Sequence, residues 1–185
     1  ENLLNYRYNH LQKAIENAAK LGFTGGAALF PMVTINGEEC HNEWEITFEE
    51  IHRNAAIAYA IYAYERYTGK MTYVENKGID VLVGISRFWS QRISFSKEKK
   101  KYVILGVTGP NEYENNVNNN WYTNYAAKWS MEYTYKRLIQ ISQEKPKVYK
   151  TIIERLDLSK TEEIDWEEKA SNIYLPYDKK NDIFL

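Results

Sequence analysis

The chain has 185 residues, a net charge of −1 and a pI near 6.4, with 24 basic and 25 acidic residues mixed along its length. This length favours one domain with a substantial core. The charge balance leaves no basic face that follows a phosphate backbone, so we expect no nucleic-acid partner.

Cysteine content and hydropathy exclude further classes of protein. A single cysteine, Cys40, cannot form an internal disulfide framework, which is typical of a reducing compartment. No apolar run has the length of a membrane span and no secretory signal opens the chain, so we expect a cytoplasmic protein with no membrane partner. Aromatic residues reach 15% of the chain, a composition that favours interfaces and ligand walls.

Helical spacing begins at the amino-terminal end. Residues 2–21 place six side chains along one helical face, and Gly22 is suited to the carboxyl-terminal cap; the six are Leu4, Tyr8, Leu11, Ile15, Ala18 and Leu21. The glycine-rich segment that runs to Pro31 predicts a loop. The following "VTINGEEC", residues 33–40, predicts a short strand with a turn at Asn36 and Gly37.

The next two helices are predicted from a capping signal and from apolar periodicity. Thr47 and Glu50 form a Thr-x-x-Glu capping box, which predicts a helix that starts there and ends at Gly69. This helix is apolar nearly all the way round between residues 55 and 64, so we expect it to lie inside a large assembly. Residues 72–92 predict a third helix despite Gly78 and Gly84.

The second half of the chain returns to helix after a strand pair. Residues 93–107 alternate around a charged turn and predict two short strands. Helices are then predicted over about 119–142, 147–156 and 160–173, and the last begins with a second capping box, Ser159 and Glu162. The first of these carries Trp121, Tyr125, Trp129, Tyr133 and Lys136 along one side. About six helices in succession predict an all-α bundle or a toroid of helical hairpins.

One polar stretch, "GVTGPNEYENNVNNNWYTN" at residues 106–124, has the composition of a site that binds sugar. A general acid for glycoside cleavage needs neighbours that do not ionise at neutral pH, and seven asparagines around Glu112 are of that kind. Tyr113, Trp121 and Tyr122 offer flat faces on which sugar rings stack. The same pattern fits an exposed acidic loop whose asparagines tolerate left-handed turns, and the residues alone leave both interpretations open.

A second acidic cluster surrounds His41 and Trp44 within residues 38–50. Several of its glutamates are expected to be plain surface charge, and the alternative is a loop that lines a pocket for a hydroxyl-rich ligand. Glu43 and Trp44 are then the first candidates for contact.

The spacing of the residues predicts neither a metal site nor a cofactor site. Cys40, His41, His52 and His10 reproduce no familiar zinc spacing, so we expect no metal site. The glycine-rich segment lacks both a dinucleotide fingerprint and a phosphate-loop lysine, so we expect no bound cofactor.

Three stretches closely resemble the maltose phosphorylase branch of glycoside hydrolase family 65. They are "GGAALFPMVTINGEECHNEWEITFEEIHRNAAIAYAIYAY", "ISRFW" and "GVTGPNEYENNVNNNWYTN". The resemblance implies that residues 1–185 are part of an (α/α)6 barrel, the catalytic domain of a bacterial cytoplasmic enzyme that is usually a homodimer. The family's amino-terminal β-sandwich and carboxyl-terminal part, its Trp-Asp glucose motif and its phosphate-holding residues have no counterpart in these residues. We therefore expect the isolated chain to be inactive.

The resemblance also implies a reaction and the residues that perform it. These enzymes split maltose with inorganic phosphate, which is a co-substrate and not a cofactor, into β-glucose 1-phosphate and glucose with inversion. The glutamate of the family's "NEY" motif is the general acid, and here it is Glu112. The loop from His41 to Glu45 and onward toward Glu49 corresponds to the part that shapes the leaving-glucose subsite, so the expected substrate contacts are His41, Asn42, Glu43, Trp44 and Tyr113. The alternatives are a phosphorylase for trehalose, nigerose or kojibiose, and a sugar-binding helical domain without catalysis.

Overall fold

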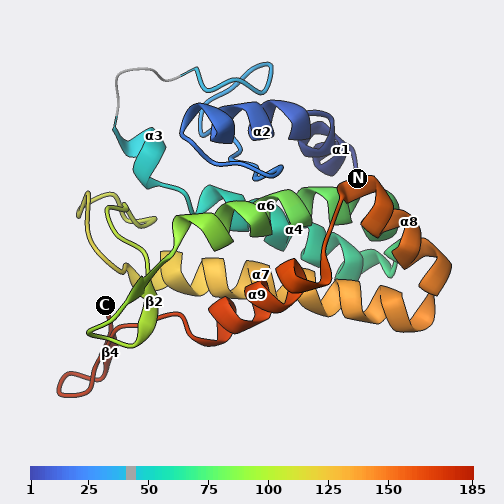
Figure 1. Ribbon diagram of the computed structural model, residues 1–185. Coiled ribbons are helices and arrows are strands. Elements are labelled where there is room, and N and C mark those ends of the chain that lie inside the picture. The colour runs from blue at the N-terminus through green and yellow to red at the C-terminus, as the bar shows by residue number, and fades with distance from the viewer. Residues whose placement is uncertain (41–44) are drawn as a thin grey trace.

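The computed structural model describes residues 1–40 and 45–185, and most of them are helical. The long helices form three layers (Figure 1). One outer layer holds α1 and α2, the middle layer holds α4 and α6, and the other outer layer holds α7 and α9, with α8 joining α7 to α9. Their bounds are α1 Asn2–Asn9, α2 Leu11–Lys20, α4 Arg53–Thr68, α6 Ile79–Arg92, α7 Trp121–Glu144, α8 Pro146–Leu156 and α9 Lys160–Ser171.

Short elements connect these helices. A single turn, α3 (Ile46–Glu49), precedes α4, and α5 (Met71–Tyr73) continues through a π-helical turn, η1 (Val74–Gly78), into α6. Two antiparallel hairpins lie at the same end of the molecule as α3 (Figure 1). They are β1 (Ser94–Ser96) with β2 (Lys101–Val103), and β3 (Tyr177–Asp178) with β4 (Ile183–Phe184).

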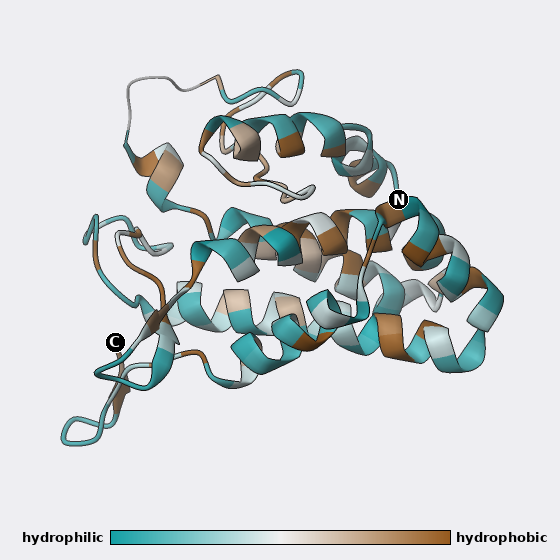
Figure 2. Cartoon of the chain, viewed as in Figure 1, coloured by the Kyte–Doolittle hydropathy of each residue, from teal (hydrophilic) through white to brown (hydrophobic). Residues whose placement is uncertain are grey.

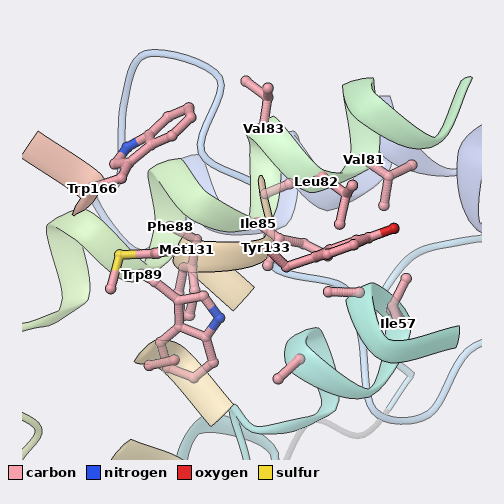
Figure 3. Packing of buried hydrophobic residues seen from close by; sticks show 14 of the residues in the cluster. Ile57, Val81, Leu82, Val83, Ile85, Phe88, Trp89, Met131, Tyr133 and Trp166 are labelled. Carbon is pink, nitrogen blue, oxygen red and sulfur yellow. The ribbon is translucent and has the colours of Figure 1, made fainter. Parts of the chain in front are cut away.

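The hydrophobic core surrounds α6, which contacts α2, α4, α7 and α9. Successive residues from Ile79 to Ser86 are all buried, and so are Phe88 and Trp89. Brown apolar positions occur on several sides of this helix in Figure 2, and Figure 3 shows Leu82, Ile85 and Phe88 close to Met131 and Tyr133 of α7. A helix that is apolar on most sides must be enclosed by other helices, and α6 is the one enclosed here.

The described residues cover α4 only in part. Tyr59 is 58% exposed and Tyr67 is 91% exposed, and Ala56 and Ala60 on the same helix are also exposed. Among the described elements α4 contacts α6, α7, α1 and η1, and these contacts leave Tyr59, Ala56 and Ala60 uncovered. Sequence hydropathy could not separate these two helices because both lack a clear polar face.

Two boundaries in the first half of the chain also differ from expectation. The first helix is broken at His10, whose φ of −99° lies outside helical values, so residues 2–21 form α1 and α2. The capping box at Thr47 and Glu50 does not start the long helix, because both residues are buried within and just after α3, and α4 begins at Arg53.

The strand predicted over residues 33–40 is absent from that part of the described chain. The amides of Met32 and Val33 donate hydrogen bonds to the carboxylate of Glu39, at 2.6 and 3.0 Å. The amide of Cys40 donates to the carbonyl oxygen of Val33 at 2.7 Å. The segment therefore folds back on itself and meets its backbone hydrogen bonds locally, which leaves no extended edge for a partner strand.

Other sequence predictions are confirmed. Gly69 ends α4 with a φ of +66°, the left-handed conformation that glycine adopts without strain. The hairpin after α6 forms as expected. The Oγ atom of Ser159 accepts a hydrogen bond from the amide of Glu162 and caps α9, although the Glu162 carboxylate pairs with Arg87 and does not complete the box. Together these elements give an all-α fold with short hairpins, as expected.

Gly84 sets how closely the glycine-rich loop approaches α6. A Cβ atom at this position would lie 2.9 Å from the Cβ of Ala28 and 3.3 Å from Leu11 Cδ1. The amide of Ala28 also donates a hydrogen bond to the carbonyl oxygen of Gly84 at 2.8 Å. The absence of a side chain therefore lets the loop bond directly to the helix backbone.

We predict that Gly84→Ala lowers the free energy of unfolding by about 1 kcal/mol, because overpacking outweighs the better helix propensity of alanine. The matched control is the double variant Gly84→Ala with Ala28→Gly, which removes the opposing Cβ atom. Its stability in chemical denaturation should exceed the sum of the two single effects. Simple additivity of the three variants would contradict this account.

Candidate active site

The polar stretch forms a loop that leaves β2 and returns to the start of α7. Its two arms are joined where Val107 and Val117 exchange backbone hydrogen bonds of 2.9 and 2.8 Å. Between them, residues 108–116 make a tip at the same end of the molecule as α3 (Figure 1). The tip therefore has a fixed base.

Most of the asparagines hold this loop together. The side-chain oxygens of Asn118 and Asn119 accept hydrogen bonds from the amides of Gly106 and Ile104, at 3.0 and 3.1 Å. The side chain of Asn120 accepts from the amide of Thr123 and caps α7. The three consecutive asparagines thus act on the backbone of the loop, and not as the uncharged neighbours of Glu112 that the composition indicated.

Close contacts fix the entrance and exit of the tip. A Cβ atom at Gly109 would lie 2.6 Å from Asn120 Nδ2, so only glycine fits against that capping side chain. Earlier on the same arm, the guanidinium of Arg92 donates a 2.5 Å hydrogen bond to the carbonyl oxygen of Leu105. Burial lowers the pKa of Arg92.

Glu49 joins the loop to α3. One oxygen of its carboxylate, Oε2, accepts hydrogen bonds from Thr108 Oγ1 at 2.6 Å and from the amide of Asn116 at 2.8 Å. Its carbonyl oxygen also accepts from the amide of Thr108 at 3.2 Å. Bonds to an ionised acceptor are stronger than neutral ones, so Glu49 sets the distance between the two segments.

Glu112 lies at the tip of this loop and is exposed. Its φ of +53° is in the left-handed region, which is uncommon for a residue other than glycine. Outliers of this kind are often held at functional positions by the surrounding structure. Here the Val107–Val117 pairing and the Glu49 contacts supply that support.

Two side chains from the junction of α3 and α4, Glu50 and His52, lie within electrostatic range of Glu112. Burial raises the pKa of Glu50, and the negative charge of Glu112 and a hydrogen bond to its carboxyl group raise it further, against a smaller opposing effect of Arg53. Burial lowers the pKa of His52, opposed mainly by a hydrogen bond to the backbone of Thr108. The three side chains therefore form a cluster in which one carboxyl group is buried, one is exposed and the imidazole is neutral at pH 7.

The aromatic residues near the loop take different positions. Tyr113 is 89% exposed. Trp121 stacks on Tyr125 with ring centroids 4.9 Å apart and also contacts the ring of Phe184, so its ring is engaged in packing. Tyr122 meets the edge of His52 at 5.5 Å.

A groove of about 410 Å³ continues from Tyr122 along α4 and α7. Its walls are mostly small apolar and aromatic side chains: Ala55, Ala56, Tyr59, Tyr122, Tyr125, Ala126 and Trp129. The groove begins beside the ring of His52, so an aromatic surface leads away from the Glu112 cluster.

Four of the expected substrate contacts, His41, Asn42, Glu43 and Trp44, lie outside the described residues. The described part of the same segment ends at Glu49, whose carboxylate is occupied by the loop. Within residues 1–40 and 45–185, no three His, Cys, Asp or Glu side chains gather as metal ligands do. In the same ranges, no helix has both the length and the apolar character needed to cross a membrane.

Sequence reasoning missed Glu50 and His52 as members of the cluster. Glu50 was assigned to a helix cap and His52 was considered only as a metal ligand. A useful signal was available, because a Glu-x-His spacing directly after an acidic loop, at the start of a helix, places two titratable groups at one helix end.

The whole chain, residues 1–185, matches the family described as "Glycosyl hydrolase family 65 central catalytic domain". The chain belongs to glycosyl hydrolase family 65. The resemblance carried by the three sequence stretches is therefore confirmed, and the helical layers are part of the (α/α)6 barrel of that family.

Several proteins similar to this chain are named phosphorylases. The chain is 57% identical to maltose phosphorylase of Bacillus subtilis over all 185 residues, and 38% identical to α,α-trehalose phosphorylase of Thermoanaerobacter brockii over 98% of its length. It spans 23% of each of these proteins. A solved structure named "Putative kojibiose phosphorylase from human microbiome" is 30% identical and superimposes with a TM-score of 0.87, over 98% of this chain and 26% of that one.

We expect Glu49→Ala to release the loop from α3, because it removes two charge-assisted hydrogen bonds at once. Amide hydrogen exchange of residues 106–120, followed by mass spectrometry, should accelerate by at least about tenfold. Glu114→Ala is the matched control, since it removes an exposed carboxylate from the same loop. Equal exchange rates in the Glu49 variant and the unchanged protein would show that the loop does not depend on this contact.

Proposed function

We propose that this chain supplies the general acid and part of the leaving-sugar subsite of a maltose phosphorylase. The observation that carries the proposal is the 57% identity to the Bacillus subtilis maltose phosphorylase over all 185 residues, compared with 38% to a trehalose phosphorylase. The cluster of Glu112, Glu50 and His52 gives the proposal a chemical basis.

In the proposed reaction, Glu112 gives its proton to the oxygen that bridges the two glucose units. The bond between that oxygen and the anomeric carbon breaks, and the electron pair stays on the oxygen. A phosphate oxygen attacks the anomeric carbon from the opposite face and forms β-glucose 1-phosphate, which inverts the configuration. Phosphate is already an anionic nucleophile, so one carboxylic acid is enough where a hydrolase needs a second group to activate water.

The exposure of Glu112 agrees with a role at an open cleft. An acid at the tip of a loop reaches a substrate only if its backbone is fixed, and the Glu49 contacts and the left-handed conformation supply this. Residues 41–44 precede α3 directly, and we propose that His41, Asn42, Glu43 and Trp44 contact the leaving glucose together with Tyr113.

We further propose that these residues work within a longer enzyme. The chain spans 23% of the maltose phosphorylase that it matches, and the exposed aromatic side of α4 and α7 is a surface that further helices of a barrel would cover. The phosphate would be held by residues beyond this segment. We propose that this longer enzyme is a cytoplasmic homodimer and that it needs no cofactor.

Product analysis of the full-length protein tests the reaction. With maltose and inorganic phosphate we expect glucose and β-glucose 1-phosphate in equal amounts, and without phosphate we expect no cleavage. Cleavage that is independent of phosphate would identify a hydrolase. Faster phosphorolysis of trehalose, nigerose or kojibiose would move the substrate assignment to that disaccharide.

Glu112→Gln should lower kcat about a hundredfold or more with a modest change in KM, because a glutamine cannot donate the proton but keeps the shape of the side chain. Glu114→Gln, two residues along the same loop, is the matched control and should keep its rate. A Glu112 variant as fast as the unchanged protein would favour a sugar-binding domain without catalysis.

A further inference from the structure

The helical turn that carries Glu49 depends on its neighbours for its position. α3 has four residues, Ile46–Glu49, and a helix of this length is not stable without contacts to the rest of the protein. The side chain of Ile46 is buried, but apolar burial has no preferred direction, whereas a hydrogen bond does. The bonds that other residues make to the backbone of this turn therefore decide where Glu49 lies.

Arg53, the first residue of α4, bonds to the backbone on both sides of Glu49. Its Nη1 atom donates hydrogen bonds to the carbonyl oxygen of Thr47 at 2.6 Å and to that of Glu50 at 3.0 Å. These two carbonyl groups come before and after Glu49 in the chain. Because one nitrogen meets both of them, the turn cannot rotate or shift without loss of a charge-assisted hydrogen bond.

The other donors of Arg53 connect this turn to the core. Nε donates a hydrogen bond to the carbonyl oxygen of Phe30 at 2.6 Å, and Nη2 lies 3.9 Å from the carboxylate of Glu39. Phe30 is fully buried, and its amide donates to Asn54 Oδ1 at 3.0 Å. Two consecutive residues of α4 therefore hold Phe30 by its carbonyl and amide groups, and the guanidinium links α3 to this enclosed part of the chain.

The contacts of Arg53 need an arginine. Its side chain is only 15% exposed, and burial lowers its pKa to about 10, so it stays charged at neutral pH. The planar guanidinium presents several donors in fixed directions, whereas the ammonium group of a lysine is a point charge. A lysine at this position would keep the charge but would not make the bonds to Phe30, Thr47 and Glu50 together.

Glu49 relates the position of α3 to the loop that carries Glu112. Its Oε2 atom accepts hydrogen bonds from Thr108 Oγ1 and from the amide of Asn116, which come before and after Glu112 in the chain. The partners of Arg53 described above all lie outside this loop. Its bonds therefore reach the loop through α3.

We propose that Arg53 is a positioning residue for Glu112, which it holds in place through α3 and the carboxylate of Glu49. The inference rests on the proposed function, because Glu112 is the general acid only in that reaction. Arg53 does not touch the substrate in this scheme. Its loss lets the tip of the loop move, and a displacement of about 1 Å in a reacting group lowers a rate by up to about a hundredfold.

A double-mutant cycle in the full-length protein tests the inference. Arg53→Lys should lower kcat about tenfold and change the KM for maltose and for phosphate by less than about twofold, because it displaces the proton donor and not the binding groups. Glu49→Ala should lower kcat by at least as much. The double variant should lose no more than Glu49→Ala alone, since Arg53 acts through that carboxylate. Losses that multiply in the double variant would overturn the inference.

Two further comparisons separate a positioning role from other roles of Arg53. A rise of about tenfold or more in the KM for phosphate in Arg53→Lys would identify a phosphate ligand and would overturn the inference. Arg66→Lys is the matched control, because it makes the same change on the same helix at an exposed guanidinium that donates to the hydroxyl of Tyr62. Its kcat should stay within about twofold of the unchanged protein. A loss in Arg66→Lys equal to that in Arg53→Lys would also overturn the inference.

Hydrogen exchange of the unchanged full-length protein keeps the inference testable if Arg53→Lys does not fold. We expect α3 and the tip of the loop to open as one unit, so the amides of residues 46–50 and 108–116 should lose protection at the same denaturant concentration. In a folded Arg53→Lys variant both sets should exchange at least about tenfold faster while α7 keeps its rate. Independent opening of the two segments in the unchanged protein would overturn the inference.

The two proposals fail in different ways. An unchanged protein without phosphorolysis removes the proposed function and with it the role of Arg53 in catalysis. Phosphorolysis that needs Glu112, with losses that multiply for the changes at Glu49 and Arg53, removes only the inference about Arg53.

Discussion

The position of the candidate site depends on one carboxylate oxygen, Glu49 Oε2. It accepts from Thr108 and from the backbone of Asn116, and so ties the tip of one loop to a helical turn far away in sequence. Without this contact, the loop that carries Glu112 would lose the side-chain bonds that hold it at a fixed distance from the segment that carries Glu50. The hydrogen bonds by Asn118, Asn119 and Arg92 fix the base of the loop, and Glu49 relates its tip to α3.

Two neighbouring residues, Glu49 and Glu50, have opposite effects on the stability of the fold around the candidate site. The carboxylate of Glu49 accepts hydrogen bonds from two donors, as a structural carboxylate should. Glu50, the next residue in the chain, has a raised pKa and a like-charged neighbour, which costs folding free energy at neutral pH. Neighbouring glutamates therefore have opposite roles, and the left-handed backbone of Glu112 adds a further local cost.

The extent to which sequence anticipates this structure depends on the range of the interaction. Helices with local signals were found, including α7 with its capping Asn120 and α9 with Ser159. Errors arose where a tertiary contact replaced a local one. Glu39 takes the hydrogen bonds of a predicted strand, and Glu50, in a sequence that reads as a cap, is buried against another segment.

The candidate site was predicted in the same uneven way. The loop around Glu112 was identified from composition. Its asparagines were expected to surround Glu112 as uncharged neighbours, but the side chains of Asn118 and Asn119 bond to the backbone of the loop itself. The charge of Glu112 acts on Glu50 although the two residues are distant in the chain, and no spacing rule connects them. Burial, which decides the charge state of Glu50, is a property of the packed molecule and cannot be obtained from local sequence.

The π-helical turn η1, between α5 and α6, has a consequence for the length of this segment. A π turn holds one more residue than an α-helical turn, so it rotates everything that follows by about 100° relative to a continuous helix. Arg92 meets the carbonyl oxygen of Leu105 in this rotated setting, and Gly84 meets Ala28 in it as well. A deletion of one residue within Val74–Gly78 would therefore leave a regular helix whose far end presents the wrong face to the loop. The extra residue in η1 therefore sets which face α6 presents to its neighbours. It lies about two helical turns before Gly84, the first residue of α6 whose contact depends on this rotation.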